Sequence, residues 1–103
     1  EIRYEPLGTI LAVMPWNFPF WQVFRCAAPI LLSGNSMVLK HASNVSESSL
    51  AIESVFHEAC RRERLDRAMF ASFLLPASRV EKLVADPRIR GVTLTGSEGA
   101  GRK

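Results

Sequence analysis

The sequence is poor in the residues that build disulfide frameworks and metal sites. Its 103 residues include two cysteines and two histidines. Cys26 and Cys60 stand in helical patterns without the spacing of metal ligands. Each cysteine is therefore predicted to be a small buried hydrophobic residue in a reducing compartment, and no metal site is expected.

Concentrated charge and long hydrophobic runs are scarce as well. The formal net charge is +3, and the densest basic cluster, residues 61–67, is interrupted by two carboxylates. This pattern is typical of a solvated helix end rather than of a nucleic-acid surface. The longest apolar stretch, residues 18–32, contains a glutamine, an arginine and a proline, and is too short and polar for a membrane span. The first six residues are charged and polar, unlike a signal peptide. We expect a cytoplasmic chain that binds neither nucleic acid nor membrane.

What the sequence does have is an alternation of strand-like and helix-like segments. Hydrophobic residues make up 48% of the chain, enough for a core. Strands are predicted over residues 9–14, 36–40, 69–75 and 92–95, and helices over residues 20–32, 44–64 and 78–84 and from residue 96. This order predicts an α/β fold, an open parallel Rossmann-like sheet with helices on both faces, forming part of one domain.

Several residues are predicted to mark helix ends. Gly34 is suited to follow the first helix. Asn44 and Glu47 have the spacing of a capping box for the second helix. Ser78 is predicted to cap the third helix, in which Val80, Leu83 and Val84 are expected to face inward.

The chain is organised around the turn at residues 15–20, Pro-Trp-Asn-Phe-Pro-Phe. Its two prolines restrict the preceding residues, so Met14 and Phe18 are predicted to be extended. The turn holds one amide side chain, Asn17, at the carboxyl end of a strand, where open α/β sheets bind ligands. In a purely structural alternative, Asn17 is a helix N-cap and Pro19 the first helical residue.

Two more polar sites follow strand ends, at Lys40 to Ser43 and at Gly96-Ser97. Carboxyl ends of parallel strands share one edge of an open sheet. A lysine there can reach a hydroxyl or phosphate as a compact cation, and a Gly-Ser helix start offers N–H groups and a hydroxyl to a phosphate. Each site also has a structural reading, a strand-end lysine and a plain helix cap. The three together favour a nucleotide site.

These motifs carry a family resemblance over almost the whole chain, in order and at similar spacing. They are Glu5-Pro6-Leu7-Gly8, Pro15-Trp16-Asn17-Phe18-Pro19, Gly34-Asn35 before the strand that ends at Lys40, and Leu94-Thr95-Gly96-Ser97 with Gly101. The chain resembles the cofactor-binding domain of the aldehyde dehydrogenase superfamily, most of all its succinate-semialdehyde dehydrogenase-like branch. The resemblance implies that residues 1–103 are a partial NAD(P)-binding domain. The whole enzyme would be a homo-oligomer that oxidises an aldehyde, with succinate semialdehyde a candidate, to a carboxylate.

The resemblance also implies residue roles. Asn17 matches the catalytic amide that stabilises an oxyanion in this family. Trp16 matches a wall of the cofactor cleft, and Lys40 a lysine that holds the adenosine ribose or its phosphate. The predicted cofactor-binding residues are Trp16, Asn17, Lys40, His41, Ala42, Ser43, Gly96 and Ser97.

Ser43 departs from many NAD-preferring members, which carry a glutamate that binds the ribose hydroxyls. A carboxylate there would repel a 2′-phosphate, whereas a serine leaves room and can donate a hydrogen bond. NADP is therefore the favoured cofactor, with NAD the alternative. His41 either adds positive charge beside this position or is a bystander.

The family's nucleophilic cysteine and general-base glutamate have no match among these residues. Neither Cys26 nor Cys60 has the setting of the nucleophile, and residues 61–79 lack the glycine-rich turns common in the family. The chain begins without methionine and stops where a helix begins, so we expect a piece of an enzyme, without the catalytic domain and inactive alone. The alternatives are a non-catalytic nucleotide-binding or interaction module, and a remnant whose open sheet edge keeps it from folding stably.

Overall fold

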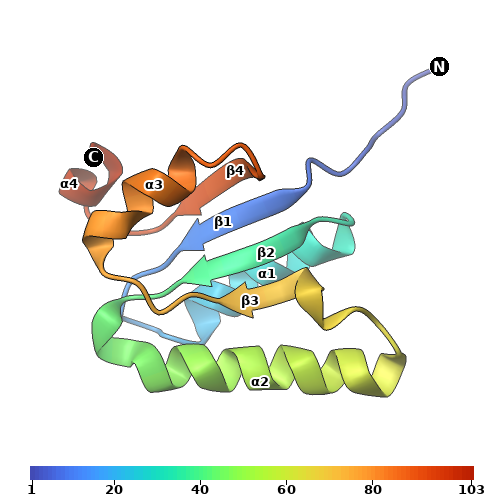
Figure 1. Ribbon diagram of the computed structural model, residues 1–103, viewed down its shortest axis with the longest axis horizontal. Coiled ribbons are helices and arrows are strands. Elements are labelled where there is room, and N and C mark those ends of the chain that lie inside the picture. The colour runs from blue at the N-terminus through green and yellow to red at the C-terminus, as the bar shows by residue number, and fades with distance from the viewer.

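Four parallel strands form one sheet in the order β3-β2-β1-β4 (Figure 1). The computed structural model describes all residues, Glu1–Lys103. The strands are β1 (Thr9–Val13), β2 (Ser36–Lys40), β3 (Phe70–Ser72) and β4 (Ile89–Leu94). The helices are α1 (Trp21–Leu32), α2 (Ser46–Glu63), α3 (Val80–Val84) and α4 (Glu98–Gly101), with short 3₁₀ turns at Ser43–Val45, Arg67–Met69 and Ala77–Arg79. The predicted α/β fold with an open parallel sheet is confirmed.

The β1 strand lies inside the sheet, between β2 and β4. Its residues pair in register with β2, from Thr9 beside Ser36 to Val13 beside Lys40. Ile10, Leu11 and Ala12 are all buried. A continuous apolar run is what a parallel strand covered on both faces requires, and this explains the composition of the segment.

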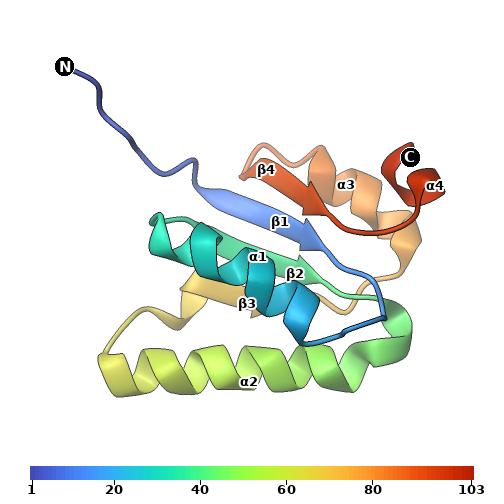
Figure 2. The same cartoon turned by 180° about the vertical axis from the view of Figure 1, so that it is seen from behind.

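Helices cover both faces of the sheet, but unequally. Figure 2 shows α1 in front of the sheet, with α3 on the opposite side. The main core lies on the α1 side and joins α1 and α2 to β1, β2 and β3. It consists of Ala12, Met14, Val23, Ala27, Met37, Leu39, Ile52 and Phe70. On α3, Val80 and Leu83 are half-buried, whereas Val84 is 49% exposed. The prediction that Val84 faces inward was wrong because α3 is a single short turn that covers little of its face.

The end of α1 has the predicted glycine stop. Gly34 has a φ of +88°, which glycine adopts without strain. Its backbone N–H donates to Leu31 O at 3.0 Å, and that of Asn35 donates to Ile30 O at 3.2 Å. These two bonds form a Schellman motif, so local sequence ends this helix.

Both predicted side-chain caps were wrong for the same reason. Asn44 lies inside the 3₁₀ turn before α2, and Ser78 lies inside the 3₁₀ turn before α3. Neither helix start has a side-chain cap hydrogen bond. A backbone hydrogen bond forms in each 3₁₀ turn in place of the predicted side-chain cap. Val45 N donates to Ala42 O at 3.1 Å, and Arg79 N donates to Pro76 O at 3.0 Å. The extra turn moves each helix start past the predicted capping residue.

The outer strands differ in length from the predictions. β3 ends at Ser72 rather than at residue 75, because its pairing with β2 stops at Leu39. β4 begins at Ile89 rather than at residue 92, because it pairs with β1 from Thr9 onward. Pairing partners therefore set the length of both strands.

Candidate functional site

The carboxyl ends of β1, β2 and β4 meet at one edge of the sheet. Val13 pairs with Lys40 on one side and with Leu94 on the other. Beyond the strands, Met14 N donates to Lys40 O at 3.2 Å and Thr95 N donates to Val13 O at 3.1 Å. The three polar segments, residues 15–20, 40–43 and 95–97, therefore leave the sheet from neighbouring strands, as predicted.

Asn17 is exposed in the turn between β1 and α1, and its side chain has no hydrogen-bond partner in the protein. The helix begins at Trp21, and its N-cap residue is Phe20, which makes no side-chain cap bond. The alternative in which Asn17 caps the helix and Pro19 begins it was therefore wrong. The Asn17 amide remains free to bind a ligand, and Trp16 beside it is 64% exposed.

Phe18 holds the turn in an unusual backbone conformation. Its φ is +50°, so the prediction of an extended Phe18 was wrong. The chain must reverse within a few residues between β1 and α1, and Phe18 makes this reversal. Its carbonyl accepts from Gln22 N at 3.1 Å, and its ring packs edge-on against Trp21 with centroids 6.0 Å apart. A left-handed conformation costs an ordinary residue about 1–2 kcal/mol, so surrounding contacts must hold this turn.

His41 lies directly after β2 and is only 4% exposed. Its Nε2 lies 2.8 Å from Pro19 O, and its Nδ1 lies 3.0 Å from Ala42 N. A carbonyl can only accept and an amide N–H can only donate, so Nε2 carries the proton and Nδ1 accepts. Both nitrogens are engaged within the chain. Within the chain His41 links two loops, and its direct contact with a cofactor stays a prediction.

Lys40 is the cation of this edge. Lys40 as a whole residue is 6% exposed. Its ammonium forms no ion pair or hydrogen bond with another side chain. Burial lowers the pKa of Lys40 below its ordinary value, because water no longer solvates the charge fully. The stem of Lys40 is buried, whereas its ammonium reaches solvent without a carboxylate partner and can pair with an anion bound at the site.

Ala42 and Ser43 continue the segment outward. Ala42 is half-buried, and Ser43 is exposed at the start of the 3₁₀ turn. The carbonyl of Ser43 accepts from Ser46 Oγ at 2.9 Å, while its own hydroxyl has no partner in the protein. Ser43 can therefore donate to a ligand held by Lys40.

Gly96 and Ser97 begin the last turn of the chain. Ser97 Oγ caps α4 by accepting from Ala100 N at 3.3 Å. A Cβ built on Gly96 would meet only ordinary contacts, the nearest being Ala100 Cβ at 3.6 Å. Nothing in the chain itself requires glycine at position 96. This space suits the close approach of a bound molecule to the backbone.

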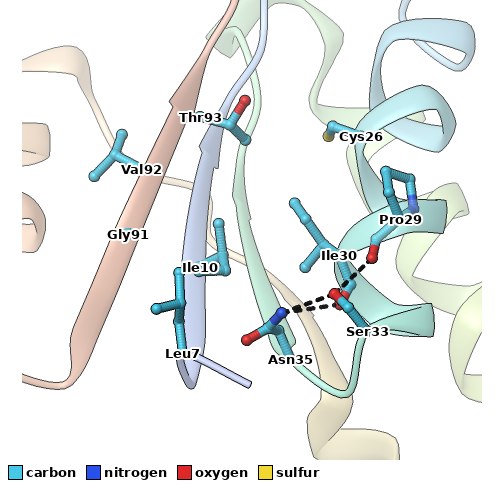
Figure 3. Close-up of a pocket in the computed structure, with 10 residues that line it drawn as sticks. All are labelled: Leu7, Ile10, Cys26, Pro29, Ile30, Ser33, Asn35, Gly91, Val92 and Thr93. Atoms are coloured by element: carbon cyan, nitrogen blue, oxygen red, sulfur yellow. Dashed lines mark hydrogen bonds between the residues drawn. The ribbon is translucent and has the colours of Figure 1, made fainter. Parts of the chain in front are cut away.

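An open groove of about 440 Å³ lies elsewhere, on the α1 face of the sheet (Figure 3). It is lined by Leu7, Ile10, Cys26, Pro29, Ile30, Ser33, Asn35, Gly91, Val92 and Thr93. Two of its polar side chains are already bonded within the chain, since Asn35 Nδ2 donates to Ser33 Oγ at 3.0 Å and Ser33 Oγ donates to the backbone carbonyl of Pro29 at 2.7 Å. The groove therefore offers little to a polar ligand and is separate from the carboxyl edge.

Neither thiol has the setting of a nucleophile. Cys26 Sγ donates to Val23 O at 3.2 Å, and burial raises the pKa of this thiol. Cys60 is buried and Cys26 is half-buried, so the prediction of a buried cysteine holds in full for Cys60 only. Only a thiolate is strongly nucleophilic, so the raised pKa of Cys26 argues against a nucleophilic role for that residue.

The link between His41 and Pro19 is the feature of this edge that sequence reasoning missed. The two residues are 22 positions apart, and no local pattern signals the contact.

None of the helices is both long and apolar enough to cross a membrane.

Comparison with known proteins gives a consistent result. Residues 1–103 match the aldehyde dehydrogenase family throughout. The chain is 52% identical over 101 residues to the succinate-semialdehyde dehydrogenase [NADP(+)] of Mycobacterium avium, covering 98% of this chain. It is 55% identical over 100 residues, 97% of this chain, to a probable succinate-semialdehyde dehydrogenase [NADP(+)] of Synechocystis.

A solved structure agrees with these relatives. The succinic semialdehyde dehydrogenase of Streptococcus pyogenes, in complex with NADP⁺ as the cofactor, superposes with a TM-score of 0.87 at 40% identity and covers 95% of this chain. In all three comparisons the chain spans about a fifth of the other protein, 21% of its length.

Proposed function

The chain belongs to the aldehyde dehydrogenase family, and from this premise we propose that it supplies part of the cofactor site of an NADP-dependent enzyme that oxidises an aldehyde to a carboxylate. Succinate semialdehyde is the substrate we propose, because both relatives and the solved structure described above carry that name. The nucleophile and the general base of such an enzyme have no counterpart among these residues. We therefore expect these residues alone to be catalytically silent.

The unpaired ammonium of Lys40 is the observation that carries the proposal. The lysine is 6% exposed as a whole, its ammonium reaches solvent and has no protein partner, and it lies at the edge where three strand ends converge. A phosphate group would supply the missing anion, and Lys binds phosphate as a point charge. The nearby hydroxyl of Ser43 is free to donate to the same group. We assign this pair to the 2′-phosphate of NADP.

The other residues of the edge fit a dinucleotide that extends from Lys40 toward the turn at residues 15–20. Gly96 leaves space for a close approach to the backbone, and Trp16 offers an exposed aromatic wall. When bound, the nicotinamide accepts a hydride from the substrate. The Asn17 amide, which has no protein partner, would donate to the oxyanion that forms when a thiolate attacks the aldehyde carbonyl.

The compartment, oligomeric state and partners of the proposed enzyme are inferred from the same family membership. We propose a cytoplasmic homo-oligomer that binds no nucleic acid. Several arginines are already paired on the surface: Arg61 and Arg62 with Glu58, Arg88 with Asp86, and Arg102 with Glu98. These pairs break up the basic surface that a nucleic acid would need.

The test is a calorimetric titration with NADP and with NAD. It uses a graft enzyme, in which residues 1–103 replace the matching segment of the Synechocystis relative, and the 103-residue chain alone for comparison. Lys40→Met should weaken NADP binding by about tenfold or more, as expected for the loss of a charge-assisted contact. Lys82→Met, at an exposed position on α3, is the matched control and should leave binding unchanged. Equal affinities of the graft enzyme and its Lys40→Met variant would overturn the assignment.

A further inference from the structure

We propose that His41 is a positioning residue that holds the Asn17 turn in place through the carbonyl of Pro19. The inference rests on the proposed function, since it concerns how the oxyanion donor is aimed. Nε2 of His41 donates to Pro19 O at 2.8 Å, and this oxygen lies two residues beyond Asn17. The bond joins the end of β2 to the turn between β1 and α1.

The Asn17 side chain depends on such a link because it makes no bond of its own to the protein. Its position is set only by the backbone on either side. Before it, Met14 N is held by Lys40 O at 3.2 Å. After it, Phe18 has a φ of +50°, which is unfavourable for an aromatic residue unless neighbours hold it. The His41–Pro19 bond lies directly beyond that strained residue.

The second nitrogen of His41 orients the ring and reaches the cofactor segment. Nδ1 accepts from Ala42 N at 3.0 Å, and Ala42 stands between His41 and Ser43. One buried ring therefore connects the segment proposed to hold the 2′-phosphate with the turn proposed to hold the oxyanion. The two nitrogens serve different segments, so their losses should have different kinetic consequences.

A histidine elsewhere in the chain separates this role from simple structural support. Nε2 of His57 on α2 also lies 2.8 Å from a backbone carbonyl, that of Phe70 on β3. This bond has the same chemistry and length, but it lies between α2 and the start of β3, away from the carboxyl edge. His57 thus provides a matched control for the loss of one such bond.

Two substitutions of His41 separate the two bonds in the graft enzyme. The Oδ1 atom of an asparagine occupies a place close to Nδ1, so His41→Asn keeps an acceptor for Ala42 N and loses the donor to Pro19 O. The Nε2 atom of a glutamine occupies a place close to the ring Nε2, so His41→Gln keeps that donor and loses the acceptor.

His41→Asn should lower kcat about tenfold with little change in the KM for NADP, because the oxyanion donor loses its alignment. His41→Gln should keep kcat within about twofold and raise the KM for NADP about fivefold, the effect of one lost hydrogen bond.

The controls distinguish failure of this role from failure of the proposed function. His57→Asn should change neither parameter. If His41→Asn and His41→Gln change kcat and KM in parallel, or if His57→Asn lowers kcat as much as His41→Asn does, His41 is structural and the positioning role is wrong. If the unsubstituted graft enzyme binds NADP but oxidises no aldehyde, or binds no NADP, the proposed function fails and the inference fails with it.

Discussion

The carboxylate of Glu53 on α2 accepts a 2.5 Å hydrogen bond from the backbone N–H of Ser72 on the edge strand β3. Four residues further along α2, His57 Nε2 donates to Phe70 O at 2.8 Å, and one turn earlier Ser49 bonds the Ser72 hydroxyl. This spacing places the three side chains on one face of the helix. Glu53 and His57 occupy backbone groups that an edge strand otherwise presents to another chain. The helix α2 therefore closes one edge of the sheet.

Glu53→Ala should destabilise the chain by about 1–3 kcal/mol, because the Ser72 N–H loses its partner in a partly buried place. Glu53→Gln keeps an acceptor and should cost less than half as much. Urea unfolding measures both, and size-exclusion chromatography should show more association for Glu53→Ala. Equal losses for the two variants would show that the charge, and not the acceptor, stabilises the edge.

Asn35 ties the end of α1 to the entry of β1, 27 residues away. Its Oδ1 accepts from Gly8 N at 3.0 Å, and its Nδ2 donates to Ser33 Oγ at 3.0 Å and to Ile30 O at 3.3 Å. Asn35→Ala should cost about 2 kcal/mol in the free energy of unfolding. Asn35→Asp keeps the bond to Gly8 and should recover about half of that loss. A denaturant midpoint unchanged in Asn35→Ala would contradict this role.

NADP affinity should depend on pH through Lys40. Burial lowers the pKa of its ammonium below 10.5, and a bound phosphate favours the charged form. NADP should therefore bind most tightly at neutral pH and lose affinity as pH rises through the lowered pKa, before 10.5 is reached. In Lys40→Arg the charge persists throughout this range, so the affinity should stay nearly constant up to about pH 10. Calorimetric dissociation constants between pH 7 and 10 check this, and an identical decline in both proteins would assign the titration to another group.

The stability of the free chain should change with pH in the same interval. Because the pKa of Lys40 is lower when folded, the unfolded state binds more protons between the two pKa values, and stability rises with pH there. Lys40→Met should remove this rise. The check is urea unfolding of both proteins across the same pH range.

Ser43→Glu should shift cofactor preference from NADP toward NAD. A carboxylate at this exposed position would repel the 2′-phosphate and accept from the ribose hydroxyls. The ratio of NADP to NAD affinity should fall about tenfold or more, as a repulsive contact at short range predicts. Asn44→Glu adds the same charge one residue further along the same 3₁₀ turn. It should change the ratio less than threefold, because salt screens the repulsion between this carboxylate and the 2′-phosphate. An unchanged ratio in Ser43→Glu would remove Ser43 from the phosphate site.

Asn17→Ala in the graft enzyme should lower kcat by about 10²–10³, the usual effect of removing an oxyanion donor. The KM for NADP should change little, because the amide acts on the developing oxyanion. Asn17→Asp, similar in shape but negative, should be at least as slow. A kcat within fivefold of the unsubstituted graft enzyme would exclude Asn17 as the donor.

The elements set by local rules were predictable from the sequence. The apolar run of β1, the glycine end of α1 and the alternation of strands with helices depend on residues that are near in sequence. The strand alternation also predicted that Asn17, Lys40 and Gly96 share one edge, because carboxyl ends of parallel strands lie together. The position of the candidate site thus follows from the order of the elements.

The tertiary structure decided how the residues at that edge are held. The left-handed backbone of Phe18 depends on where β1 and α1 must meet, and the link from His41 to Pro19 requires β2 to lie beside β1. The same holds for the unpaired state of Lys40, since only the folded chain shows that no carboxylate reaches it. Local sequence therefore determined which residues stand at strand ends. Packing between segments more than 20 positions apart determined which side chains are hydrogen-bonded within the protein and which remain free to bind a ligand.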